Sequence, residues 1–260
     1  MTGICLHDKK VIEKALRRNV PLHIYSIGDL DTFFWPYTTW YATDNKAEIH
    51  DIALLYSGQS PPTLVGISED TDGMRRLLES ILHLLPQRFY AHLSPGVESI
   101  FRRSCRLDSQ AEHFKMALLE PSAVDGVNCE DIECLSRENE KEILEFYQLC
   151  YPGNWFDPRM LETKQYFGIG REGRLASVAG IHVYSCEYGV AALGNIATEP
   201  SQRRKGYGMR VTAKTCQSLL KDVEHIGLNV KADNNPAISC YKRLGFGIVA
   251  AYIECMVQKF

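Results

Sequence analysis

The residues best suited to chemistry lie in a basic loop, residues 201–208, which reads Ser-Gln-Arg-Arg-Lys-Gly-Tyr-Gly. A strand is predicted before it at 193–198. Apolar residues after it, Met209, Ala213 and Cys216, recur at helical spacing, so a helix is predicted to begin where the loop ends. Glycines at a helix start let a ligand approach the free backbone N–H groups, and the helix dipole favours an anion there. The segment therefore predicts a binding site for two adjacent phosphates.

A second motif lies downstream at residues 233–246, which read Asp-Asn-Asn-Pro-Ala-Ile-Ser-Cys-Tyr-Lys-Arg-Leu-Gly-Phe. Together with Arg203-x-x-Gly206-x-Gly208, it resembles the two signatures of the Gcn5-related N-acetyltransferase (GNAT) superfamily. Within that superfamily it looks most like the FR47-like, glycine N-acyltransferase-like branch. The resemblance is specific over residues 193–246, general from residue 134 onward and weak before residue 120.

The resemblance implies an enzyme in which an amine attacks an acyl-CoA thioester directly, with acetyl-CoA as the expected donor and no metal. It implies that Tyr241 is the general acid at the leaving thiolate. Backbone groups of Ile196 and Thr198 would pair with the pantetheine arm. The remaining residues that it implies for CoA binding are Ala197, Arg203, Arg204, Lys205, Gly206, Tyr207, Gly208, Met209, Asn234 and Ala237.

The general base is left open by the sequence. The attacking amine must lose a proton near neutral pH, which requires a histidine or a carboxylate. The strand that enters the loop carries no glutamate before Glu199. The candidates are His182 and Glu187, with Glu199 and Glu254 behind them.

The acceptor is expected to be a small-molecule primary amine or an amino acid. Three aromatic residues, Tyr151, Trp155 and Phe156, lie in one predicted loop and would cover either the acceptor cleft or the N-terminal half; we favour the cleft. A second aromatic cluster at residues 33–41 is either a pocket wall or core packing. Two alternatives remain: a CoA-binding sensor or scaffold without turnover, and a protein lysine or N-terminal acetyltransferase.

Composition excludes several partner classes. The chain has 260 residues and a net charge of −3, which provides no general attraction to nucleic acid or to an anionic membrane. Nine scattered cysteines without a Cys-x-x-Cys pair indicate reduced thiols, and no metal site is expected. The first residues, from Met1, lack a signal peptide, and no transmembrane run follows. We expect a cytoplasmic protein.

The order of predicted elements repeats, which indicates an α/β (α+β) protein built from tandem GNAT-like folds. Each fold is expected to be a mixed, mostly antiparallel twisted sheet flanked by helices. The predicted division is a degenerate GNAT-like domain at 1–120, a linker at 121–130 and a catalytic domain at 131–260. The corresponding loop of the first half, residues 68–73, carries three carboxylates that would repel a diphosphate, so that half is expected to bind no CoA.

The coarse secondary structure assigns the first half to a helix (9–19), a strand (21–26), a hairpin (48–56 with 63–67), two helices (73–85 and 97–105) and strands at 89–93 and 111–119. The second half reads as helices at 138–150 and 159–166, a strand pair at 175–184 and 190–198, the helix after the loop, and a strand at 227–232. Gly168-x-Gly170 matches a dinucleotide fingerprint by letter, but a strand pattern follows it, so a hairpin is predicted there instead.

Overall fold

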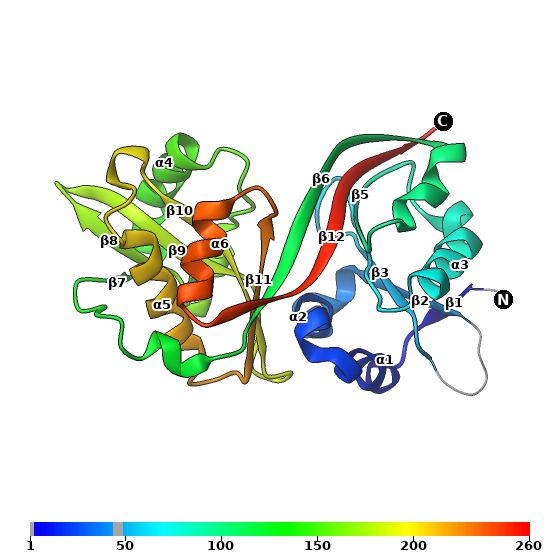
Figure 1. Cartoon of the computed structure of the whole chain (residues 1–260), viewed down its shortest axis with the longest axis horizontal. Coiled ribbons are helices and arrows are strands. Elements are labelled where there is room, and N and C mark those ends of the chain that lie inside the picture. The colour runs from blue at the N-terminus through cyan, green and yellow to red at the C-terminus, as the bar shows by residue number, and fades with distance from the viewer. Residues whose placement is uncertain (1–2, 44–48) are drawn as a thin grey trace. The chain divides into compact units, whose positions relative to one another are not determined.

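The computed structural model describes residues 3–43 and 49–260 (Figure 1). The start of the chain at Met1 and the predicted strand start at Glu48 lie outside the described residues. The chain forms two compact units. Unit 1 holds Met1–Lys115, Val230–Asp233 and Ile248–Phe260, and unit 2 holds Met116–Asn229 and Asn234–Gly247.

Unit 2 is built on a sheet in the order β11-β10-β9-β8-β7. Its strands are β7 (Glu133–Cys134), β8 (Phe167–Arg171), β9 (Arg174–Ser185), β10 (Val190–Thr198) and β11 (His225–Lys231). All neighbours in this set are antiparallel except β10 and β11, which are parallel. The predicted hairpin after Gly168-x-Gly170 is confirmed, because β8 and β9 pair across a turn at Glu172 and Gly173.

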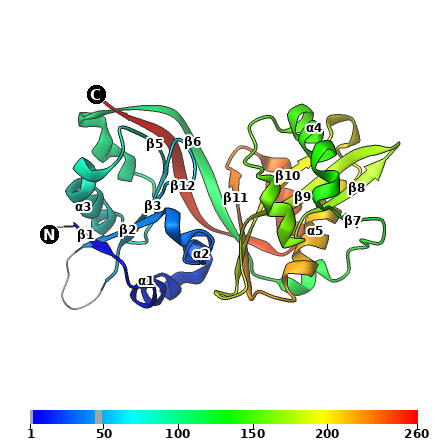
Figure 2. The same ribbon diagram turned by 180° about the vertical axis from the view of Figure 1, so that it is seen from behind.

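Helices cover both faces of the unit 2 sheet. They are α4 (Glu140–Cys150), α5 (Tyr207–Leu219) and α6 (Asn235–Arg243). Figure 1 shows α5 and α6 in front of the sheet, and Figure 2, from behind, shows α4 in front of it. Alternation along β9 explains the two layers: Ala179 packs with Val211 of α5, while the Tyr166 ring lies against the next residue, Gly180.

Unit 1 has strands in the order β1-β2-β3-β4-β5-β12-β6. They are β1 (Gly3–Leu6), β2 (Thr38–Thr43), β3 (Ile52–Tyr56), β4 (Thr63–Gly66), β5 (Arg88–Leu93), β6 (Cys105–Leu118) and β12 (Phe246–Lys259). Strands β4 and β5 pair in parallel, as β10 and β11 do in unit 2. The helices are α1 (Lys9–Leu16), α2 (Val20–Gly28) and α3 (Thr71–Ile81). Buried side chains such as Leu77, Phe89 and Phe101 pack together in the core of this unit.

The remaining helical turns are short 3-10 segments. They span Arg17–Asn19, Trp35–Tyr37, Leu82–Leu84, Val97–Arg103, Pro121–Val124, Arg137–Asn139, Pro158–Thr163 and Pro200–Gln202. Two of them replace predicted α-helices, at 97–105 and 159–166. The second of these begins with a side-chain cap, since the Asp157 carboxylate accepts a hydrogen bond from the Arg159 N–H at 2.9 Å.

One element prediction is wrong: residues 21–26 form part of helix α2 instead of a strand. The Asn19 side chain caps this helix by accepting from the Leu22 N–H at 3.2 Å, and Pro21 occupies its first turn. Both are standard helix-start features, and they outweigh the β-like pattern of the following residues.

The boundaries of the units also differ from the predicted division at 121–130. Ile248–Phe260 belongs to unit 1, although the sequence division places it in the second domain. The reason is strand pairing: β12 pairs antiparallel with β5, from Ile253 opposite Leu93 to Gln258 opposite Arg88. The end of the chain therefore completes the sheet that its beginning forms.

Candidate active site

The basic loop is an open cradle at the start of α5. Arg204 and Gly206 both have left-handed backbone conformations, with φ of 64° and 83°. A Cβ added at Gly206 would meet nothing within 4 Å, so the space in front of the loop is open. The first-turn N–H groups of a helix have no partner within the helix. The cradle thus offers backbone donors beside three exposed cations, Arg203, Arg204 and Lys205.

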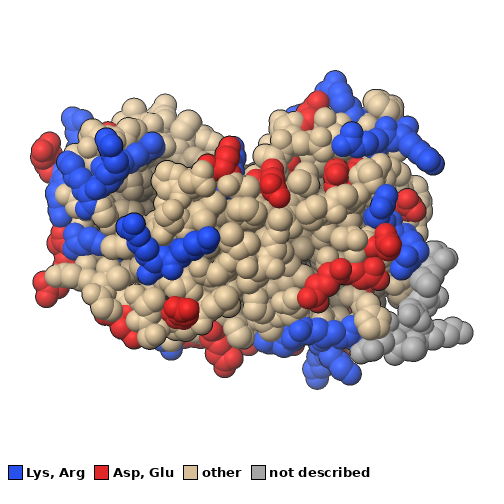
Figure 3. Space-filling view, in the orientation of Figure 1, with Lys and Arg blue, Asp and Glu red and all other residues tan. Residues whose placement is uncertain are grey.

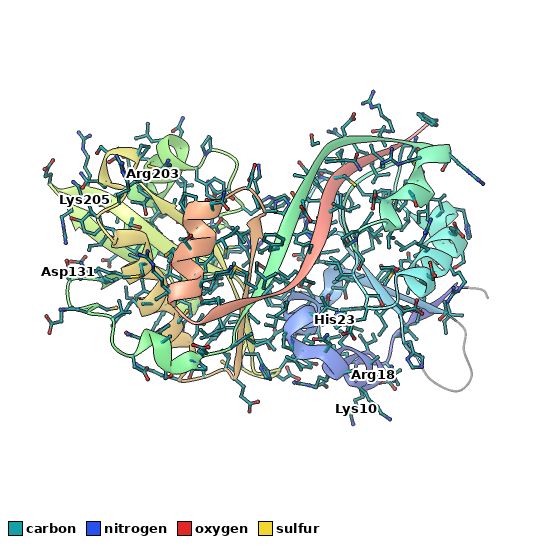
Figure 4. All side chains as sticks on the ribbon, in the orientation of Figure 1. Lys10, Arg18, His23, Asp131, Arg203 and Lys205 are labelled. Carbon is teal, nitrogen blue, oxygen red and sulfur yellow. The ribbon has the colours of Figure 1, made fainter. Side chains whose placement is uncertain are left out.

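Charged side chains surround this end of unit 2. Figure 3 shows Lys and Arg side chains gathered on this side, and Figure 4 labels Arg203 and Lys205 there. Two further arginines, Arg171 of β8 and Arg210 of α5, share one carboxylate. Both donate hydrogen bonds to Asp131, Arg171 at 2.5 Å. These hydrogen bonds lower the pKa of Asp131 to about 2. Asp131 offsets one of these two positive charges and holds both guanidinium groups, whereas Arg203, Arg204 and Lys205 have no carboxylate within 4 Å among the described residues.

The parallel strands β10 and β11 separate next to the cradle. In the described structure their pairing runs from Val190 with His225 to Leu193 with Leu228 and does not continue. Ala197 faces β9, since its carbonyl accepts a hydrogen bond from Ser177 Oγ at 2.9 Å. Neighbouring residues in a strand turn their N–H groups to opposite edges, so those of Ile196 and Thr198 face the separated edge. These groups are free to pair with an extended ligand.

Unit 1 has neither separated parallel strands nor an open helix start at the equivalent place. Its parallel strands stay paired through Gly66 and Leu93, the last residues of β4 and β5. The start of α3 is filled by the chain's own carboxylates: Asp70 accepts from the Gly73 N–H at 2.9 Å, and a Cβ at Gly73 would collide with Asp51 Oδ2. These carboxylates occupy the position that a diphosphate takes at a helix start.

Two β-bulges, one in β9 and one in β10, lie close to the point where β10 separates from β11. His182 is the extra residue of a bulge in β9, because Val183 pairs with Ala192 and Ile181 with Leu193. Asn195 lies in a bulge of β10, with φ of 54°. The two side chains meet across the strands, with His182 Nε2 3.3 Å from Asn195 Oδ1.

The surroundings of Asn195 fix the tautomer of His182. Asn195 Oδ1 accepts from the Trp155 N–H at 3.2 Å, and Asn195 Nδ2 donates to the Tyr166 hydroxyl at 2.8 Å. The Tyr166 hydroxyl in turn donates to the Ile181 carbonyl at 3.0 Å. His182 must therefore donate from Nε2, which leaves a lone pair on Nδ1. Burial lowers the pKa of His182, and the hydrogen bond to Asn195 offsets part of that effect, so the ring is neutral at pH 7.

The aromatic loop is attached to the same bulge. The Trp155 N–H bond to Asn195 holds the loop against β10, and Tyr147 of α4 donates to the Asn195 carbonyl at 2.6 Å. Phe156 packs between Tyr147 and Tyr166, at ring distances of 5.4 and 5.5 Å. Trp155 and Tyr151 remain 45% and 43% exposed, so only these two aromatic side chains of the loop are presented to a partner or substrate.

Helix α6 carries the second motif. Asn234 Oδ1 caps it by accepting from the Ala237 N–H at 3.3 Å, which leaves the Nδ2 group to face outward. Tyr241 is 8% exposed, and its ring lies 6.1 Å from that of Phe246. Both residues expected to bind or protonate CoA thus lie on one helix whose start is fixed by its own cap.

The other base candidates lie elsewhere. Glu187 is exposed in the turn between β9 and β10, at the end of β10 opposite to the cradle. Glu199 caps the turn Pro200–Gln202 by accepting from the Ser201 N–H at 3.2 Å. The hydrogen bond from the Ser201 hydroxyl, together with this one, lowers the pKa of Glu199. Glu254 belongs to unit 1, where its Oε2 lies 3.4 Å from His92 Nε2. Of the four base candidates, only His182 lies in a bulge and contacts Asn195.

Sequence reasoning missed two asparagines. Asn195 lies in the predicted strand at 193–198, where the prediction gives it no role of its own and nothing indicates its left-handed backbone. Asn229 follows Leu228, the last residue of β11 that pairs with β10, and its Oδ1 is buried without a hydrogen-bond partner among the described residues. A buried acceptor without a partner is costly, so its presence beside the separated strands indicates a ligand donor there.

Comparison with known proteins assigns the part of the chain that holds both motifs to a protein family. The model of the Acetyltransferase (GNAT) family matches residues 132–246, which include both motifs and all the unit 2 elements from β8 to α6. Residues 132–246 belong to the GNAT family. The chain thus carries a GNAT-family acetyltransferase domain, and members of that family generally use acetyl-CoA. The narrower FR47-like assignment stays a prediction.

Three relatives illustrate the similarity. A mycothiol acetyltransferase of Clavibacter michiganensis subsp. michiganensis (strain NCPPB 382) is 30% identical over 101 residues, covering 38% of this chain. The match spans only 31% of that protein's length. A Drosophila protein of known structure covers 98% of both chains with a TM-score of 0.73 at 14% identity. A tandem GNAT protein from the clavulanic acid biosynthesis pathway covers 98% of this chain and 97% of its own, with a TM-score of 0.59 at 14% identity.

These structures share the fold over both halves, so the expected tandem α/β architecture is confirmed. Over the described residues, no helix has the length and apolar character needed to cross a membrane. The same residues contain no group of three or more histidine, cysteine or acidic side chains arranged to hold a metal. All nine cysteines are free thiols.

Proposed function

We propose that the chain is an acyl-CoA-dependent N-acyltransferase that transfers an acyl group, with acetyl as the expected one, to a primary amine of a small molecule or amino acid. One observation carries the proposal. The strands β10 and β11 separate beside an open, basic helix start, while the corresponding strands and helix start of unit 1 are closed.

The CoA thioester would supply the acyl group, and the chain's own residues would hold it. The diphosphate suits the first-turn N–H groups of α5 and the cations Arg203, Arg204 and Lys205. The pantetheine arm suits the open edge of β10 at Ile196 and Thr198. Asn234 Nδ2 and the partnerless Asn229 Oδ1 offer one donor and one acceptor to amide groups in the same region.

Two side chains would move protons. His182, neutral and with its Nδ1 lone pair unused in the described structure, would take a proton from the attacking amine, directly or through a water. Tyr241 would donate a hydrogen bond or a proton to the leaving thiolate. A phenol, with an ordinary pKa of about 10, keeps its proton at neutral pH and can therefore still stabilise a thiolate as a donor. Asn195 would act as a positioning residue, since it sets the tautomer of His182 and holds the loop at Trp155.

A panel assay tests the proposal. Free thiol release from acetyl-CoA is measured with the full chain and a series of small primary amines, amino acids and one lysine-containing peptide. Amine-dependent release that exceeds the rate without amine, with a small amine as the best acceptor, supports the proposal. Binding of acetyl-CoA without amine-dependent release would favour a sensor or scaffold, and a preference for the peptide would favour a protein acetyltransferase.

A further inference from the structure

Two glycines face each other beside the bulges that carry His182 and Asn195. Gly180 of β9 and Gly194 of β10 are register partners in an antiparallel pair, so a side chain on either would project from the same face of the sheet. Ala179, one residue before Gly180, packs with α5, so the two glycines face away from that helix. Because glycine within a strand often marks a close approach of another group to the backbone, the pair indicates such an approach here.

An aromatic ring lies directly on each glycine. A Cβ built on Gly194 would collide with the His182 ring at Cγ, Cδ2 and Nε2. A Cβ built on Gly180 would collide with the Tyr166 ring at Cδ1, Cε1 and Cζ. Both rings therefore occupy space that only glycine leaves empty.

The side-chain amide of Asn195 joins these two rings. Its Oδ1 lies 3.3 Å from His182 Nε2, and its Nδ2 donates to the Tyr166 hydroxyl at 2.8 Å. The Tyr166 ring is fixed, because it is fully buried and its hydroxyl also donates to the Ile181 carbonyl at 3.0 Å. Among the described residues, the His182 ring has only its hydrogen bond to Asn195. A methyl group added at Gly194 would therefore displace the imidazole from the asparagine.

We propose that Gly194 is a positioning residue for the base: its missing side chain lets the His182 imidazole lie close enough to the sheet to bond to Asn195. Gly180 does the same for the Tyr166 ring, which holds that asparagine from its other side. The effect on the reaction rate rests on the function proposed above. The contact between ring and glycine does not depend on turnover, so it can be tested without a substrate.

A double-mutant cycle on thermal stability tests the contact. Gly194→Ala should lower the Tm of the wild-type protein, because the methyl group and the imidazole compete for one space. In a His182→Ala background that space is empty, so the same substitution should leave Tm unchanged or raise it. Even if Gly194→Ala alone fails to fold, the double variant should fold as His182→Ala does. An equal loss of stability in both backgrounds would overturn the proposal.

An NMR titration of the His182 ring tests its positioning. The ring signal is assigned by its loss in His182→Gln. Burial holds the pKa of His182 below 6.5, so a displaced and hydrated ring in Gly194→Ala should titrate closer to 6.5. The titratable side chains bonded to Asn195, Tyr147 and Tyr166, stay neutral throughout, because burial raises the pKa of both above 10. An unchanged midpoint in Gly194→Ala would contradict the proposal.

Kinetics connect the contact to the reaction. With the best amine, Gly194→Ala should lower kcat by about a hundredfold and move the acid limb toward pH 6.5, whereas the dissociation constant for acetyl-CoA should change by less than the rate does. Gly168→Ala on β8 is the matched control. Its added Cβ would also be crowded, at 2.9 Å from Leu135 and 3.0 Å from Leu175, but neither side chain belongs to the bulges, so kcat and the acid limb should persist.

The outcomes separate this proposal from the proposed function. A wild-type chain without amine-dependent turnover would reject the function, while the stability cycle and the titration would still decide whether Gly194 positions His182. An active wild type with an equally active Gly194→Ala would overturn the positioning role and leave the function intact.

Discussion

His182 and Asn195 are joined across two bulges: the extra residue of one strand meets the bulged residue of its neighbour, with Nε2 and Oδ1 3.3 Å apart. A bulge re-aims a side chain that regular pleating would direct elsewhere. Asn195 also accepts from the Trp155 N–H and donates to Tyr166, so one amide connects the histidine, the aromatic loop and the sheet. The proposed base is thus oriented by groups that stay fixed while it gains and loses a proton.

The first prediction concerns the pH dependence of the reaction. Burial lowers the pKa of His182 from 6.5, so its neutral form persists to lower pH. If neutral His182 is the base, kcat at saturating amine should fall on an acid limb centred below pH 6.5. His182→Gln should lower kcat by about 10²- to 10⁴-fold and remove that limb. His225→Gln, a substitution on β11 outside the bulge, should preserve it; an acid limb unchanged in His182→Gln would exclude the residue as base.

The second prediction concerns the cradle. Calorimetry should find one acetyl-CoA per wild-type chain and none for Gly206→Asp, because the new carboxylate would repel the diphosphate at the helix start. Gly173→Asp is the matched control, since Gly173 has φ of 73° against 83° at Gly206 and neither added Cβ meets an atom within 4 Å. Both variants carry a similar left-handed strain of roughly 1–2 kcal/mol. Two sites in the wild type, or near-normal affinity in Gly206→Asp, would show that the cradle is misassigned.

The third prediction separates the two kinds of aromatic residue in the loop. Trp155 is 45% exposed, so Trp155→Ala should raise KM for the amine several-fold while leaving Tm and KM for acetyl-CoA nearly unchanged. Phe156 packs against two buried rings, so Phe156→Ala should instead lower Tm, with a destabilisation of about 3 kcal/mol. A Trp155→Ala variant that loses stability but keeps its acceptor kinetics would assign Trp155 to packing alone.

The fourth prediction concerns the leaving group. Tyr241→Phe keeps the ring beside Phe246 and removes one donor, so kcat should fall by about ten- to a thousandfold. The dissociation constant for acetyl-CoA, measured by calorimetry, should change by less than the rate does. An unchanged kcat with the best acceptor would leave Tyr241 a packing residue.

Much of the fold follows from local sequence signals, but the site does not. The loop at 201–208, the cap at Asp157 and the β8–β9 hairpin were all predictable, because each depends on residue types a few positions apart. The helix at α2 was predictable too, from Asn19 and Pro21, and was missed because the apolar pattern was given more weight. By contrast, the pairing of β12 with β5 joins residues more than 150 positions apart, for which no local signal exists.

The arrangement at Asn195 shows the same limit within the site. Its left-handed backbone arises from a bulge, and its partners come from α4, the aromatic loop and two strands. None of these contacts has a sequence period that identifies it in advance. His182 could be named as one of several candidate bases, but only the tertiary structure separates it from Glu187, which lies at the far end of the same hairpin.

Direct attack by the amine on bound acyl-CoA is the central claim, and initial velocities with both substrates varied test it most directly. Intersecting double-reciprocal lines are expected with the best amine, and the intact mass of the protein should stay unchanged when acetyl-CoA is added alone. Parallel lines, together with a stable mass increase of one acetyl group on the protein, would contradict it, because they would require an acyl-enzyme intermediate such as a thioester on one of the free cysteines.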